Sequence, residues 1–210
     1  MPVQRSRPHP KSKMRTARVV LTSIVVAATI THSVHAQSAQ PFSIQGSLLY
    51  SGLSGKAYDN FDPGVGFEVQ GRYTTAFGLS IGIGFQHTSH HVLGADGGSL
   101  AGPFVEPRYA FEIKGVNRIY PYVSVRASAL KQSISGPDFE TTASGFTANA
   151  GGGVLFGLSE RVNVDVGATF GLTNFSHFVL IDAATGRQVT GNTGSGSNFV
   201  VRTGLAVGLF

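Results

Sequence analysis

The chain has 210 residues, with 16 Lys and Arg, 11 Asp and Glu, and no Cys. The lack of Cys excludes a disulfide framework, a thiolate metal site and a lipid-modified N-terminal Cys. Six basic residues and no acidic one lie in residues 1–36, whereas residues 37–210 hold ten basic and eleven acidic residues. The remaining chain is therefore nearly neutral, and its charge gives no support to nucleic-acid binding.

The first 36 residues have the three parts of a cleavable signal peptide. A basic stretch precedes a 12-residue apolar run, 19–30, and small residues follow at Val34 and Ala36. A membrane-spanning helix needs about 20 apolar residues. We therefore predict export, with cleavage before Gln37. An uncleaved anchor and a true start at Met14 are the alternatives.

Residues 37–210 form the second predicted domain, and period-two alternation dominates it. All 28 Gly lie there, and helical spacing is not sustained anywhere in it. Each alternating segment has about the ten residues that a tilted membrane-crossing strand requires. The eight segments are 42–52, 64–74, 77–87, 104–113, 119–129, 145–156, 162–172 and 199–209.

The links between the segments alternate in length. Long links at 53–63, 88–102, 131–144 and 173–198 alternate with short ones at 75–76, 114–118 and 157–161. This asymmetry is typical of an outer-membrane barrel, with turns in the periplasm and loops outside. In the last long link, residues 178–181 and 187–190 flank 182–186 like a hairpin, which predicts that the strands extend outward there.

A soluble β-sandwich also alternates, but the aromatic residues favour a membrane barrel. Up-and-down strands place them in two belts around an aliphatic band, as expected at two membrane–water interfaces. The periplasmic belt is Phe42, Tyr73, Phe77, Tyr109, Phe111, Phe156 and Phe210, and the outer belt is Tyr50, Phe85, Phe146, Phe170 and Phe199. We therefore predict an all-β, eight-stranded antiparallel up-and-down transmembrane β-barrel.

The face opposite the aromatic belts carries charges and points into the predicted barrel. An eight-stranded barrel is just wide enough for side chains to fill it. Guanidinium groups that bridge carboxylates would plug it, whereas a hydrated lining would gate ions. We favour the plug. The predicted lumen network is Glu68, Arg72, Glu106, Arg108, Glu112, Arg126, Asp165 and Arg202.

The chain resembles the small eight-stranded outer-membrane barrels, such as the OmpA membrane domain and OmpX. The resemblance rests on the strand number, the loop asymmetry, the aromatic belts and the terminal Phe210. The resemblance implies an outer-membrane location with periplasmic termini, contact with lipid and lipopolysaccharide, and Phe210 as the signal read by the barrel-assembly machinery. One departure concerns register, because Gly208, Ala206 and Arg202 share the parity of Phe210, whereas the apolar face belongs to the odd positions.

One motif hints at catalysis. His87 and Ser89 point the same way on a strand, so they could form a base–nucleophile pair. The segment is similar to the His-x-Ser-Asn motif of lipid A 3-O-deacylases, although His90 replaces the Asn and Glu106 is no match for the supporting Glu. We predict that the protein is not an enzyme.

The long links are the remaining candidates for binding. Adjacent His90 and His91 point opposite ways on an extended chain, so we predict no metal site and no cofactor. The loop aromatics could contact an extracellular ligand or fold over the barrel mouth, and they are Tyr58, Phe61, Phe139, Phe175 and Phe178. The predicted role is structural or surface-binding. A narrow channel and a lipid-modifying enzyme are the alternatives.

Overall fold

The computed structural model describes residues 40–55, 58–182, 184–191 and 194–209. These residues form nine β-strands: β1 (Phe42–Ser54), β2 (Gly64–Thr74), β3 (Leu79–His90), β4 (Gly97–Ala110), β5 (Ile119–Gly136), β6 (Phe139–Gly157), β7 (Val162–Asp182), β8 (Gln188–Gly191) and β9 (Ser195–Gly208). In this part of the chain, no helix is long and apolar enough to cross a membrane. The predicted signal peptide and Phe210 lie outside the described residues.

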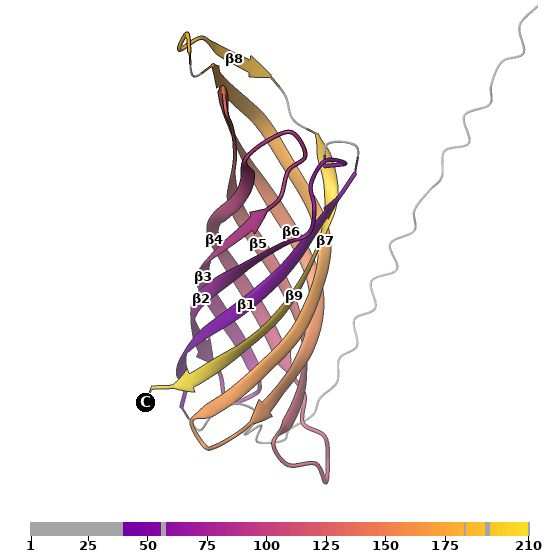
Figure 1. Ribbon diagram of the computed structural model, residues 1–210. Helices are drawn as coiled ribbons and strands as arrows, with labels where there is room; N and C mark the ends of the chain where they lie inside the picture. The colour runs from indigo at the N-terminus through magenta and orange to yellow at the C-terminus, as the bar shows by residue number, and fades with distance from the viewer. Residues whose placement is uncertain (1–39, 56–57, 183, 192–193, 210) are drawn as a thin grey trace, which may run out of the picture. The chain divides into compact units, whose positions relative to one another are not determined.

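Strands β1 to β7 and β9 close into an antiparallel barrel. Each pairs with its neighbour along the chain from β1 to β7, and β9 pairs with both β7 and β1. The β1–β9 ladder runs from Ser43↔Gly208 to Ser54↔Ser197 and joins the two ends of the sheet. Figure 1 shows the tilted strands of the barrel and the short β8 beyond its rim. The predicted eight-stranded architecture is confirmed.

Several strands are longer than the sequence pattern predicts at the loop end, which is the end with the long links. Strand β4 begins at Gly97, and β5 and β6 meet in a tight hairpin around residues 137–138, so much of the predicted loops 88–102 and 131–144 is strand. Polar pairs such as Ser133↔Thr142 continue the ladder there. Outside the membrane a strand needs no apolar face, so the alternation fades although the hydrogen bonding continues.

The last long link forms the predicted outward hairpin. Strand β7 continues to Asp182, and β8 pairs back on it from Phe178↔Gly191 to Ile181↔Gln188. The same part of β7 pairs with β6 on its other side. A sheet of β5, β6, β7 and β8 therefore rises above the rest of the barrel, with β8 at its edge (Figure 1).

The opposite end, here called the turn end, is closed by short connections. Gly78 and Gly115 adopt positive φ angles of 84° and 81° in the links after β2 and β4, a conformation that costs Gly little. The strand β3 begins at Leu79, two residues later than predicted. Strand β4 ends at Ala110, so residues 111–113 belong to the turn and not to the strand.

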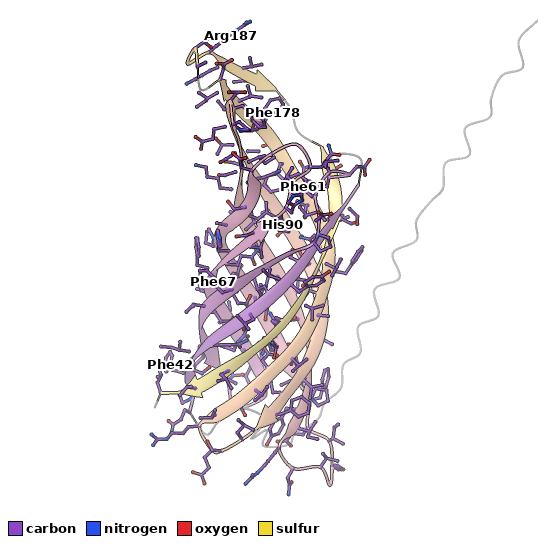
Figure 2. The ribbon with its side chains drawn as sticks, viewed as in Figure 1. Phe42, Phe61, Phe67, His90, Phe178 and Arg187 are labelled. Atoms are coloured by element: carbon purple, nitrogen blue, oxygen red, sulfur yellow. The ribbon has the colours of Figure 1, made fainter. Side chains whose placement is uncertain are left out.

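The barrel is inverted relative to a soluble protein, because most of its buried side chains are polar and its exposed ones are apolar. Phe67, Ile83 and Leu48 point outward and are at least half exposed. Aromatic pairs such as Phe42–Tyr73 and Tyr109–Phe111 lie at the turn end, and Tyr50–Phe199 lies towards the loop end. Figure 2 shows Phe42 at the lower rim and Phe67 on the outer wall. Such a surface suits contact with hydrocarbon, flanked by interfacial aromatics.

Candidate functional site

In the described part of the chain, seven Arg, Glu and Asp side chains gather inside the barrel and are called the lumen cluster below. They come from five strands, and each is at most 4% exposed. The cluster consists of Glu68 and Arg72 on β2, Glu106 and Arg108 on β4, Arg126 on β5, Asp165 on β7 and Arg202 on β9. The pleat sends alternate residues inward, and barrel closure brings these five strands around one axis.

Glu106 lies at the centre of the lumen cluster and contacts all four arginines. Its Oε1 accepts hydrogen bonds from the Nη2 atoms of Arg72 at 3.0 Å and Arg108 at 2.9 Å. Its Oε2 lies 2.7 Å from Nη2 of Arg126, and Arg202 contacts both carboxylate oxygens. Four cations around one carboxylate hold β2, β4, β5 and β9 together across the lumen.

The other two carboxylates extend the cluster. Asp165 accepts hydrogen bonds from Arg108 Nη2 at 3.0 Å, Tyr122 Oη at 2.7 Å and Gln45 Nε2 at 2.7 Å. Glu68 accepts one from Arg126 Nη1 at 2.6 Å. The side chains thus tie strands from opposite walls, and they fill the middle of the lumen.

Aromatic rings and glycines shape the space that the arginines occupy. The guanidinium of Arg108 lies 3.9 Å from the centre of the Tyr122 ring, and that of Arg126 lies 4.0 Å from the Phe104 ring. A Cβ at Gly167 would collide with the Tyr122 hydroxyl. Tyr122 was not among the predicted network residues, although its parity with Arg126 on one strand is the signal that could have identified it.

One predicted network residue is not in the cluster. Glu112 is exposed, because it lies in the turn after β4 ends at Ala110. The prediction extended strand parity into a segment where the backbone no longer alternates, so the inward assignment of Glu112 was wrong. The other seven predicted residues are brought together. Without Glu112, the described residues place four arginines and three carboxylates in the interior, whereas the sequence predicted equal numbers.

An apolar cap closes the lumen at the loop end. Tyr58, Phe61, Phe175 and Phe178 fold over the mouth instead of pointing away from it. They pack with Leu53, Leu100, Leu130 and Ala143. Burial raises the pKa of Tyr58 to about 12, so its hydroxyl stays neutral. A second apolar group, Ala110, Tyr122 and Leu155, lies on the turn-end side of the lumen.

The segment at 58–62 is fastened to the end of β3 by His90. The ring of His90 is buried, with Nε2 3.0 Å from Thr88 Oγ1 and Nδ1 3.1 Å from the Asp62 carbonyl oxygen. Phe61 packs edge-on against it, and Figure 2 shows both residues near the barrel mouth. His91 points to solvent and pairs with the Asp62 carboxylate at 3.0 Å. Within the described ranges, no group of three or more His, Cys, Asp or Glu could hold a metal ion.

The catalytic candidates His87 and Ser89 lie on the outward face of β3. Their Nε2 and Oγ atoms are 3.3 Å apart, and the His87 ring packs 5.7 Å from the Phe67 ring. Among the described residues no carboxylate lies within ion-pair distance of His87, so nothing orients the ring as the third member of a catalytic triad does. The geometry shows a hydrogen-bonded pair at the lipid boundary.

The fold and its interior define an integral barrel protein of the outer membrane, with its short turns in the periplasm and its long links outside. A family model for the outer membrane protein beta-barrel domain matches residues 23–206, and the chain belongs to this family. The match begins inside the predicted signal peptide, so the division at residues 36 and 37 stays a prediction. The outward face therefore lies among membrane lipid and lipopolysaccharide.

Solved structures show the same fold at low sequence identity. Neisserial surface protein A shares 13% identity, with a TM-score of 0.61 over 80% of this chain and 97% of that one. A major outer membrane protein from Thermus thermophilus shares 11%, with a TM-score of 0.53 over 79% and 98%. OprG from Pseudomonas aeruginosa shares 11%, with a TM-score of 0.50 over 83% and 98%. Curated protein sequences contain no match to this chain.

Proposed function

We propose that this protein is a non-conducting barrel that anchors an extracellular sheet in the outer membrane for a structural or surface-binding role. The lumen cluster is the observation that carries the proposal. Its side chains come from opposite walls and meet at Glu106, and every side chain of the cluster is buried. The apolar cap above it adds a second barrier that ions cross poorly, because burying a charge without a partner is costly.

The raised sheet is the surface that such an anchor would present. It combines the loop-end parts of β5 to β7 with β8, and its hairpin tips carry exposed Asp138, Glu140 and Arg187. Figure 2 shows Arg187 at the tip, well above the barrel mouth. Val189 on the edge strand is 45% exposed. A polar surface with an accessible strand edge suits recognition of a partner or of surface polysaccharide better than it suits a pore.

Catalysis by His87 and Ser89 is not part of this proposal. The pair has no partner carboxylate within reach among the described residues, and a serine nucleophile needs an oriented base. The barrel-assembly machinery remains the proposed partner during biogenesis, on the strength of the family and the predicted signal at Phe210.

Conductance in planar bilayers tests the closed barrel. The refolded mature protein should give no steady current above that of the bilayer alone across the voltages that the membrane tolerates. The comparison variant is Arg126→Ala, which removes the side chain that joins Glu68 to Glu106. Steady single-channel currents from the wild type would favour the channel alternative and refute the plug.

Complementation separates the structural role from the binding role. A strain that lacks the gene would receive either the full chain or a variant in which residues 180–189 are replaced by a two-residue turn. If the role is purely structural, both should restore resistance to bile salts and large antibiotics. If the raised sheet binds a partner, the trimmed variant should restore the envelope phenotype only in part, while it reaches the membrane at the same level.

A further inference from the structure

The lumen cluster has a surplus positive charge. Four guanidinium groups face three carboxylates, and no other Asp or Glu is buried in the described part of the chain. Arginine does not lose its proton in proteins. Each of the three carboxylates lies within ion-pair distance of at least one arginine. One positive charge of the lumen cluster is thus left without a counter-charge within the described ranges. The side chains of the cluster are at most 4% exposed, and a charge buried to this degree is costly when nothing balances it.

Two arginines on the turn-end side each have a buried donor without a hydrogen-bond partner in the part of the chain that the structure describes. Arg72 and Arg108 both direct Nη2 at one atom, Oε1 of Glu106, which also accepts from Nη2 of Arg202 at 3.0 Å. One oxygen is therefore shared by three cations. The Nε atoms of Arg72 and Arg108 are buried and have no hydrogen-bond partner among the described residues.

The same two arginines line a small cavity. Its volume is about 10 Å³, and its other lining residues are Ser43, Gln45, Leu155, Asn163 and Ala206. Ser43 is the half-buried member, so the cavity is reached from the turn end of the barrel. A space of this size holds about one water-sized particle, which excludes phosphate, sulfate and organic anions.

We propose that this cavity binds a single monatomic anion, chloride, which takes hydrogen bonds from the arginines and offsets the surplus charge. Leu155 and Ala206 form an apolar wall, which a weakly hydrated halide tolerates. A neutral water molecule would also fit, but it would leave the net charge unchanged. The site is independent of the proposed surface role, and a one-atom cavity does not reopen the lumen.

Urea unfolding in vesicles tests the proposal with the mature chain. Unfolding is compared in sodium chloride and in sodium gluconate at equal ionic strength, because gluconate is too large for the cavity. A ligand that binds only the folded state raises the folded-to-unfolded ratio by a factor of one plus the ligand concentration divided by Kd. With a Kd of about 10 mM, 100 mM chloride would therefore raise that ratio about elevenfold. Identical curves in the two salts would overturn the proposal.

A variant pair locates the effect. Asn163→Asp places a carboxylate in the cavity wall, so it should remove the chloride dependence and increase the folded-to-unfolded ratio in gluconate above that of the wild type. The control is Asn198→Asp at an equally buried lumen position, where Asn149 Nδ2 already donates to the side-chain oxygen at 2.6 Å. It should keep the chloride dependence. If Asn163→Asp keeps it too, the anion acts elsewhere and the proposal fails.

Bromide gives a direct readout on the wild type that does not depend on any variant folding. Crystals soaked in bromide should show an anomalous peak in contact with the guanidinium groups of Arg72 and Arg108. If the only bromide peak lies on the protein surface, the proposal is wrong. It is also wrong if the cavity shows density without anomalous signal, because the cavity then holds water.

Discussion

Replacing Glu106 by Gln should destabilise the barrel more than any other single substitution in the lumen cluster. The change is nearly isosteric, so it removes a charge without leaving a hole. It leaves four guanidinium groups competing for one neutral amide oxygen, and Arg72 loses the carboxylate that it contacts. The interior would then hold four arginines against two carboxylates.

The magnitude follows from the burial of the site. Glu106 is 0% exposed, so water cannot reach the guanidinium groups to solvate them after the carboxylate is lost. Removing one partner of a buried ion pair typically costs about 3–5 kcal/mol. Arg108 and Arg202 keep Asp165 as a partner, and Arg126 keeps Glu68. We therefore expect the free energy of unfolding to fall by about 3–5 kcal/mol for the four contacts of Glu106 together, not for each pair.

Urea titration in lipid vesicles measures this loss through the gel mobility of folded and unfolded barrel. The matched control is Glu112→Gln, an identical change on the exposed turn, which should stay within about 0.5 kcal/mol of the wild type. If the free energy of unfolding of Glu106→Gln equals that of the control, Glu106 does not hold the lumen cluster together. The double variant Glu106→Gln with Arg202→Met should recover part of the loss.

Three further predictions concern other parts of the barrel. Burial lowers the pKa of His90 below 6.5, so protonation of His90 favours the state in which segment 58–62 has detached from the end of β3. Hydrogen exchange of the Asp62 amide should therefore accelerate as the pH falls below 6.5, by more than the change in its intrinsic exchange rate. Gly167→Val should cost about 1–3 kcal/mol in urea unfolding, since its side chain collides with the Tyr122 hydroxyl. Asp182→Ala should speed trypsin cleavage after Arg187 several-fold. The Asp182 carboxylate caps the hairpin by accepting hydrogen bonds from the backbone amides of residues 184 and 185.

Each of these predictions has a matched control. His90→Gln should lose the pH dependence of exchange, whereas His91→Gln on the solvent side should retain it. Gly71→Val points a side chain into open space on the lipid face and should be tolerated, so an equal loss at both glycines would contradict the steric argument. Ser159→Ala removes a similar cap at the turn end and should leave cleavage after Arg187 unchanged.

The sequence predicted the barrel because a membrane leaves few solutions. Alternation over eight segments, two aromatic belts and unequal links are each imposed by lipid on one side of the wall, so they are readable without coordinates. The errors fall where lipid no longer acts. Strands β5 and β6 continue into the predicted loop 131–144, and Glu112 lies in a turn that strand parity cannot describe.

Parity also determined which residues face inward, and seven of the eight predicted charges do lie inside. It could not determine which of them touch. Arg126 and Glu68 are 58 residues apart, and Arg202 and Glu106 are 96 apart; they meet only because closure and strand stagger bring far walls within one side-chain length. The central place of Glu106 and its contacts with all four arginines are therefore properties of the closed barrel, since they depend on distances across the lumen that no single strand contains.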